Sequence, residues 1–158
     1  MHSDWPRMEY VRPHLDADTL ERFEQHLGHR MPDGYRRFMI EMNGGRPHEE
    51  SCRFPLGVIN TFFGLGVSET RDLAEANSGI PVLPSRDLLY IGYADCGELL
   101  LCLAGERRGQ VWLQDPEARP YDANPRVLWH DRRDMRKLAD SFEEFVRTLK
   151  PLSAPQSA

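Results

Sequence analysis

The sequence predicts an α+β fold, in which a mostly antiparallel sheet is flanked by N-terminal helices and one C-terminal helix. Two helical patterns precede residue 45, short apolar runs alternate with glycine-containing turns from residue 53 to 115, and a capped helical pattern lies near the C-terminus. A length of 158 residues corresponds to one domain. We therefore expect residues 1–150 to form a single domain and residues 151–158 to be a disordered tail.

The first helix is predicted within DADTLERFEQHLGH, residues 16–29. Its apolar stripe consists of Leu20, Phe23 and Leu27. Asp18 and Glu21 have the spacing of a capping box with Asp18 at the cap, and Gly28 is suited to end the helix.

The second helix is predicted from Pro32, which is favoured at the first helical position. Its apolar stripe consists of Tyr35, Phe38, Met39 and Met42. The segment EMNGGRP, residues 41–47, follows this stripe. Glycines that bind phosphate precede a helix, where free N–H groups point outward, whereas Asn43 and Gly44 come after one. The segment therefore indicates a helix end, with Arg46 placed to interact with the helix dipole.

The middle of the chain predicts a meander. Short runs in RFPLGVI and TFFGLG are followed by a helical segment, SETRDLAEANSG, with Ser68 as its cap. Strands are predicted at residues 88–93, 98–104 and 110–115, joined by the hairpin turns ADCG and GERRG, and a further strand at residues 126–130.

The last helix is predicted to begin at Ser141, which forms a capping box with Glu144, and to end at Pro151. Its buried face consists of Phe142, Phe145, Val146 and Leu149.

The composition and the lack of long apolar runs predict a cytoplasmic protein. No apolar run approaches the roughly 18 residues of a membrane span, and the N-terminal segment lacks the apolar stretch of a signal peptide. We therefore expect no membrane partner. The net charge of −5 argues against direct nucleic-acid binding and favours a basic protein partner.

Four stretches together resemble the SUKH superfamily: FEQHLGHRMPDGYRRFMIEMNGGRP, FFGLG, YIGYADCGELLLCLAGERRGQVWLQD and LADSFEEFVRTL. They span roughly residues 20–149. Bacterial members are mostly immunity proteins of polymorphic toxin systems, and eukaryotic members include a regulator of cell-wall glucan synthesis. The resemblance implies the α+β fold and a cytoplasmic immunity protein that binds and neutralises a cognate toxin domain. The alternative is a regulatory protein-interaction module without a toxin partner, and a third possibility is a small enzyme with an unrecognised site.

The candidate partner-binding residues are carboxylates near the predicted turns. They are Glu49, Glu50, Asp95, Glu98, Asp115 and Glu117. Charged side chains at exposed turns can contact a partner, although they also serve simply as a solvated surface.

We predict no catalytic site, metal site or cofactor. His26 and His29 have a spacing that two metal ligands can use, but a third ligand is not evident. Cys102 could pair with His130 as a nucleophile, but a cysteine in an apolar strand is usually a small buried hydrophobe.

Three aromatic residues on neighbouring predicted strands, Tyr90, Tyr93 and Trp112, are candidates for a platform on which a base or sugar could stack. Strand alternation places Tyr90 and Tyr93 on opposite faces, so we expect them and Trp112 to serve packing instead.

Overall fold

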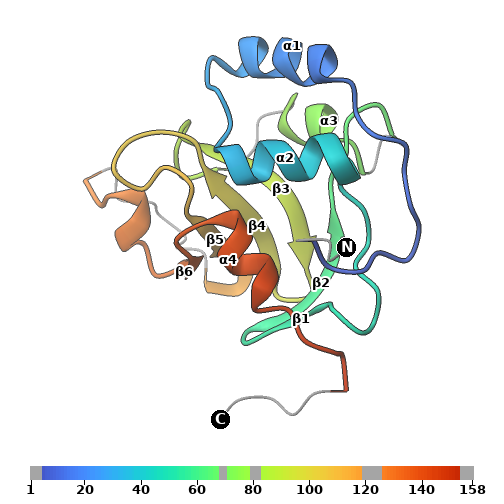
Figure 1. The fold of residues 1–158 in the computed structure, drawn as a ribbon. Coiled ribbons are helices and arrows are strands. Elements are labelled where there is room, and N and C mark those ends of the chain that lie inside the picture. The colour runs from blue at the N-terminus through green and yellow to red at the C-terminus, as the bar shows by residue number, and fades with distance from the viewer. Residues whose placement is uncertain (1–4, 68–70, 79–82, 119–125, 154–158) are drawn as a thin grey trace.

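A six-stranded antiparallel sheet forms the centre of the molecule (Figure 1). The computed structural model describes residues 5–67, 71–78, 83–118 and 126–153. The strands follow one another in chain order: β1 (Arg53–Phe54), β2 (Gly57–Phe62), β3 (Leu88–Ala94), β4 (Gly97–Cys102), β5 (Val111–Gln114) and β6 (Met135–Ala139). The predicted α+β meander is confirmed.

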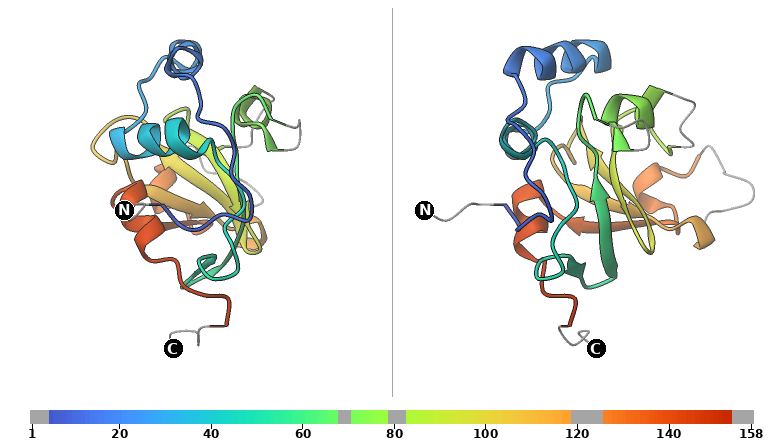
Figure 2. Two further views of the ribbon diagram at one scale, coloured as in Figure 1. Left: turned by 45° about the vertical axis from the view of Figure 1, so that its right-hand side comes forward. Right: turned by 90° about the vertical axis from the view of Figure 1, so that its right-hand side faces the viewer.

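The described residues also form four α-helices and two short 3-10 turns. These are α1 (Ala17–Leu27), α2 (Asp33–Met42), α3 (Leu73–Ser78), α4 (Phe142–Arg147), η2 (Pro116–Ala118) and η3 (Trp129–Asp131). Helices α2 and α4 lie on one side of the sheet, with α1 outside α2 (Figure 2).

The main core lies between these helices and the sheet. Its centre is aromatic: the ring of Phe38 on α2 lies 4.8 Å from Phe142 on α4 and 5.5 Å from Phe62 on β2. All three side chains are fully buried, so they link both helices to the sheet. The carboxylate of Glu143 on α4 lies directly over Gly34 of α2, in the space that a Cβ would occupy.

The N-cap of the first helix lies two residues earlier than predicted. Asp16, and not Asp18, is the N-cap, since the carboxylate of Asp16 accepts a hydrogen bond from the Asp18 amide at 3.2 Å. Glu21 reaches across to Arg36 on α2 instead of closing a capping box. The predicted end is confirmed: Gly28 is left-handed, with φ of 77°.

The end of α2 at Asn43 and Gly44 is confirmed. Asn43 has a φ of 50° and Gly44 a φ of 72°. Gly44 is also required by space, because a Cβ would lie 2.4 Å from the carbonyl oxygen of Phe63. The side chain of Asn43 accepts from the Leu65 amide at 2.7 Å and donates to the Leu65 carbonyl at 3.0 Å. Arg46 interacts with Glu9 at 3.7 Å and not with the helix end.

The prediction of a strand at residues 126–130 is wrong. These residues form a turn and η3, and the sixth strand is β6 at residues 135–139. Val127 and Leu128 are 42% and 61% exposed, while Trp129 packs on Trp112 with ring centroids 4.9 Å apart. The charged side chains within β6 conceal it in the sequence, and an edge strand tolerates them because one of its sides faces solvent.

The remaining helix ends are partly as predicted. Ser141 caps α4, since its hydroxyl accepts from the Glu144 amide at 3.1 Å, but the helix ends at Arg147 and not at Pro151. The carboxylate of Asp72 accepts from the Glu75 amide in the first turn of α3. Ser68, the predicted cap of that helix, lies outside the described residues, as do residues 154–158 of the predicted tail.

Candidate partner-binding surface

The turn between β3 and β4 carries the first predicted contact residue, Asp95. Gly97 at the end of this turn lies against β5, since a Cβ at this position would be 2.1 Å from the carbonyl oxygen of Gln114. Its φ of 153° also favours glycine. The Asp95 carboxylate accepts a hydrogen bond from the Val58 amide at 2.8 Å. The side chain is therefore held in place by the β1–β2 hairpin.

Asp115 and Glu117 lie at the same end of the sheet, where β5 ends. The Asp115 carboxylate accepts from the Glu117 amide at 2.9 Å and so begins η2. Burial, together with the charges of Asp95 and Asp115, raises the pKa of the neighbouring Cys96 thiol to about 11. Both carboxylates therefore lie near one thiol. We call Asp95, Asp115 and Glu117 the carboxylate end.

Glu98 lies on β4 opposite Gln114 and Tyr93, and it is half-buried. Burial, together with the nearby Glu98 charge, raises the pKa of the Tyr90 hydroxyl to about 12. Glu98 is therefore close to Tyr90, and it is less exposed than Asp95 and Glu117.

Glu49 and Glu50 lie in the turn before β1. The Glu50 carboxylate pairs with Arg7 at 3.0 Å, and both side chains are more than 60% exposed. The Glu49 carbonyl accepts from the Leu152 amide at 2.6 Å. These contacts join the turn to the chain segments before α1 and after α4.

The two tyrosines of β3 are on the same side, contrary to the prediction. The pairing of β3 with β4 shifts between Tyr90 and Gly92, and this irregularity interrupts the alternation of faces. As a result both rings contact Phe63, with centroids 4.9 Å and 6.0 Å apart. Trp112 is buried in a second, smaller core, so its predicted packing role is confirmed.

Cys102 is a buried core residue, as predicted. It is 1% exposed, and its thiol donates to the Ala104 carbonyl at 3.2 Å. Burial raises the pKa of the Cys102 thiol and of the Cys52 thiol, as it does for Cys96. All three thiols are therefore held in the protonated, weakly nucleophilic form near neutral pH. The imidazole of His130 lies 3.3 Å from the Asp131 carboxylate.

His26 and His29 lie near the end of α1. Within the described ranges, no three His, Cys, Asp or Glu side chains are grouped closely enough to hold a metal ion.

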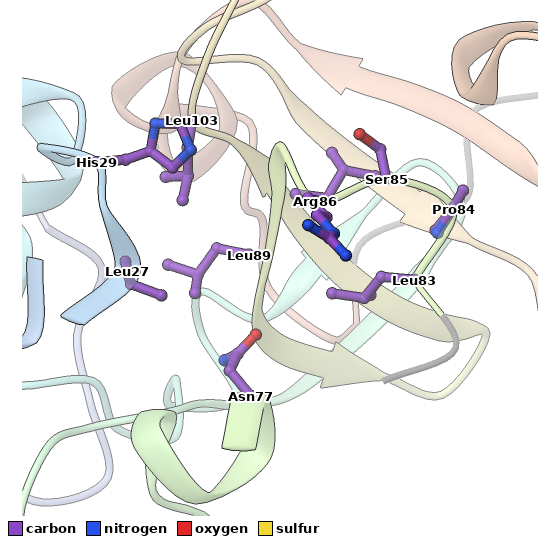
Figure 3. A pocket seen from close by; sticks show the side chains of 10 residues that line it. Leu27, His29, Asn77, Leu83, Pro84, Ser85, Arg86, Leu89 and Leu103 are labelled. Carbon is purple, nitrogen blue, oxygen red and sulfur yellow. The ribbon is translucent and has the colours of Figure 1, made fainter. Parts of the chain in front are cut away.

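A groove of about 590 Å³ lies at the opposite end of the strands, and sequence reasoning missed it. Its floor includes Leu89 of β3, and its two walls are the end of α1, with Leu27 and His29, and the segment before β3, with Leu83 and Arg86 (Figure 3). The two walls come from segments more than 50 positions apart, residues 27–29 and 83–86, so no local sequence pattern predicts the groove.

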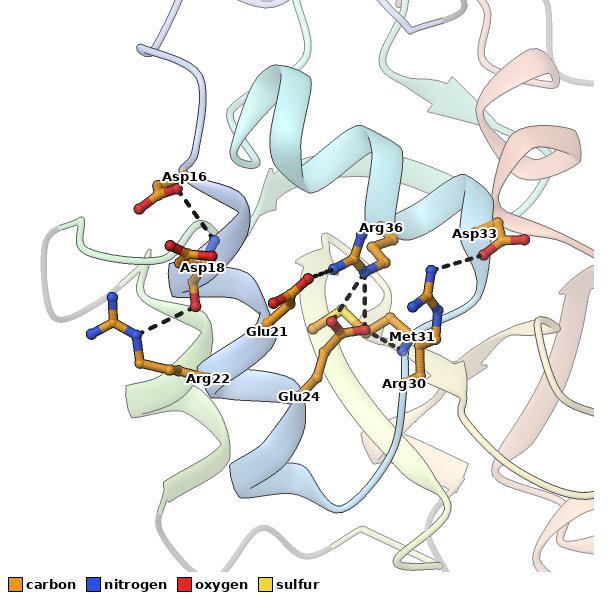
Figure 4. A network of polar contacts seen from close by, with 9 residues as sticks. All are labelled: Asp16, Asp18, Glu21, Arg22, Glu24, Arg30, Met31, Asp33 and Arg36. Atoms are coloured by element: carbon orange, nitrogen blue, oxygen red, sulfur yellow. Dashed lines mark hydrogen bonds and ion pairs between the residues drawn. The ribbon is translucent and has the colours of Figure 1, made fainter.

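A buried ion pair fixes the α1 wall of this groove. The Glu24 carboxylate, in a residue that is 7% exposed, binds the Arg36 guanidinium at 3.0 Å and the Met31 amide at 2.8 Å (Figure 4). Glu21 adds a second contact to Arg36 at 3.4 Å. The network therefore holds the C-terminal half of α1 against α2.

The fold and its exposed polar turns define an α+β domain built around an antiparallel meander. Residues 14–148 match the SMI1 / KNR4 family (SUKH-1), and the chain belongs to this family. The earlier resemblance to the SUKH superfamily is thereby confirmed. A search of curated proteins found no match to the chain. None of the helices in the described parts of the chain is long and apolar enough to span a membrane.

Proposed function

We propose that this protein is an immunity protein that binds a cognate toxin domain and neutralises it. Membership of the SMI1 / KNR4 family (SUKH-1) over residues 14–148 carries this proposal, because the bacterial members of the superfamily are mostly immunity proteins. The function requires protein–protein binding and neither a catalytic group nor a cofactor.

The carboxylate end is the proposed centre of the contact. Backbone hydrogen bonds hold Asp95 and Asp115 in place before any partner arrives, so little side-chain entropy is lost on binding. Clustered negative charge favours a basic surface and increases the rate of association. Glu49, Glu50 and Glu98 are proposed as secondary contacts, since their carboxylates are either farther along the surface or less exposed.

Charge reversal at Glu117 tests this surface with little risk to the fold, because only the backbone amide of Glu117 takes part in the hydrogen bond to Asp115. We expect Glu117→Lys to weaken binding to the cognate toxin domain by about tenfold. The control is Glu106→Lys, an equal charge change in the exposed turn at the opposite end of β4. Calorimetry with the purified toxin domain measures both affinities.

Toxicity provides the functional readout. Cells that express the toxin domain should grow when the wild-type chain is co-expressed, and growth should be reduced with Glu117→Lys but not with Glu106→Lys. Absence of both binding and rescue would favour the regulatory module of the same fold. A specific turnover of a small metabolite by the purified chain would instead show that it is an enzyme.

A further inference from the structure

The groove between α1 and the segment before β3 combines an apolar floor with a cationic opening. Leu88, Leu89 and Leu103 are each less than 5% exposed and form the floor. Leu27 and Leu83 extend the apolar surface up the two walls. A volume of about 590 Å³ lies in the range of sites that bind small ligands or short peptide segments.

Two basic side chains stand on opposite sides of this opening. His29 lies on the α1 wall and Arg86 on the facing wall (Figure 3). Within the described part of the chain, neither side chain has an ion-pair or hydrogen-bond partner. The Arg86 guanidinium is a cation without a carboxylate partner among the described residues, so it is available to an anionic ligand, and the His29 imidazole can donate a hydrogen bond to the same ligand.

The surroundings strengthen this positive character. Arg30 follows His29, and Arg108 of the β4–β5 turn donates a hydrogen bond to the Arg30 carbonyl at 2.7 Å. Both arginines are exposed, and Arg30 also lies 4.0 Å from the Asp33 carboxylate, so Arg108 and Arg86 contribute the uncompensated charge. The protein as a whole carries a net charge of −5, so these arginines beside the groove are not explained by composition.

We propose that this groove binds a segment of a partner protein that combines leucine-like side chains with carboxylates. Two leucine side chains would occupy the floor, and neighbouring carboxylates would pair with Arg86 and accept a hydrogen bond from His29. Two facing walls suit an extended segment. This binding is separate from the proposed toxin contact, because the groove and the carboxylate end lie at opposite ends of β4.

The test uses an acetylated Leu-Leu-Glu-Glu peptide as the probe and NMR amide shifts of the full chain as the readout. We expect saturable shifts at groove residues, and none with the Leu-Leu-Lys-Lys peptide. Arg86→Glu should weaken the affinity for the acidic peptide by about fivefold or more, because one favourable charge pair becomes a repulsive one. Arg147→Glu, the same change at an exposed position on α4, should leave the affinity unchanged.

Several outcomes would overturn the proposal. They are shifts outside the groove, equal binding of the acidic and basic peptides, wild-type affinity in Arg86→Glu, and no binding at millimolar concentration. Octanoate is the comparison for a lipid source of the same chemistry: if octanoate occupies the groove and the peptide does not, the ligand is a lipid and not a protein segment. Thermal unfolding of both variants verifies that they are folded.

Discussion

Asn43 shows how a single residue can end a helix and connect it to the sheet. Its backbone is left-handed, with φ of 50°, and its buried side chain makes two hydrogen bonds with the backbone of Leu65. We expect Asn43→Gly to lower the free energy of unfolding by about 2 kcal/mol, because it leaves two buried backbone groups without partners. Asn43→Ala should cost about 1 kcal/mol more, since alanine does not tolerate the left-handed conformation.

Urea unfolding of the two variants separates these contributions. Gly is the matched control for Ala, because both remove the side-chain hydrogen bonds and only Ala introduces backbone strain. Wild-type stability in Asn43→Gly would show that water replaces the bonds to Leu65 at no cost.

At the scale of elements, a buried carboxylate joins β5 to the segment that precedes β6. Asp134 is fully buried, and its carboxylate accepts hydrogen bonds from Arg132 at 2.8 Å and 2.9 Å and from Gln114 at 3.2 Å. Burial alone would raise the pKa of Asp134, but the hydrogen bonds and charge of Arg132, with the Gln114 bond, outweigh it and lower the pKa. The ionised form is therefore the one that stabilises the fold.

The pH dependence of stability follows from this sign. Because the folded pKa lies below the unfolded value of about 3.9, the stabilisation is present above that value and is lost as the pH falls through the folded pKa. We expect Asp134→Asn to destabilise the protein by about 3 kcal/mol near neutral pH, because an amide cannot accept both bonds from Arg132. The difference from wild type should narrow as the pH falls below the unfolded value of about 3.9 and through the folded pKa.

Urea unfolding as a function of pH provides the measurement. Asp131→Asn is the control, since the Asp131 side chain is 65% exposed. A stability difference for Asp134→Asn that stays constant down to acidic pH would contradict the assigned role of the ionised carboxylate.

At the scale of the molecule, the two proposed contact sites lie at opposite ends of the central strands. The carboxylate end lies where β4 begins and β5 ends, whereas Arg30, Arg86 and Arg108 lie near the other end. We expect the two ends to act independently, because they share no contact residues. Arg86→Glu should leave toxin affinity within about twofold of wild type, and Glu117→Lys should leave affinity for the acidic peptide equally unchanged.

The same calorimetric and NMR titrations, each repeated with the other variant, measure this independence. Raised salt should weaken both interactions, since exposed charges are screened within about 10 Å at 0.1 M salt. If Arg86→Glu weakened toxin binding as much as Glu117→Lys, the toxin would contact both ends and a single extended surface would replace the two proposed here.

The sequence by itself determined the elements whose signals are local. The end of α1 at Gly28, the end of α2 at Asn43 and the cap of α4 at Ser141 each depend on residues within one helical turn. The central hairpins were predictable for the same reason, because a short glycine-containing turn between two apolar runs has few alternatives to antiparallel pairing.

Only the tertiary structure decided the features that depend on contacts between distant segments. The shifted pairing near Ile91 places Tyr90 and Tyr93 on one side of the sheet. The charged side chains of β6 are tolerated because β6 is an edge strand. One wall of the groove is the end of α1, which the Glu24–Arg36 ion pair holds against α2. Register, edges and walls are set by packing between segments far apart in the chain, and a local pattern carries no record of that packing.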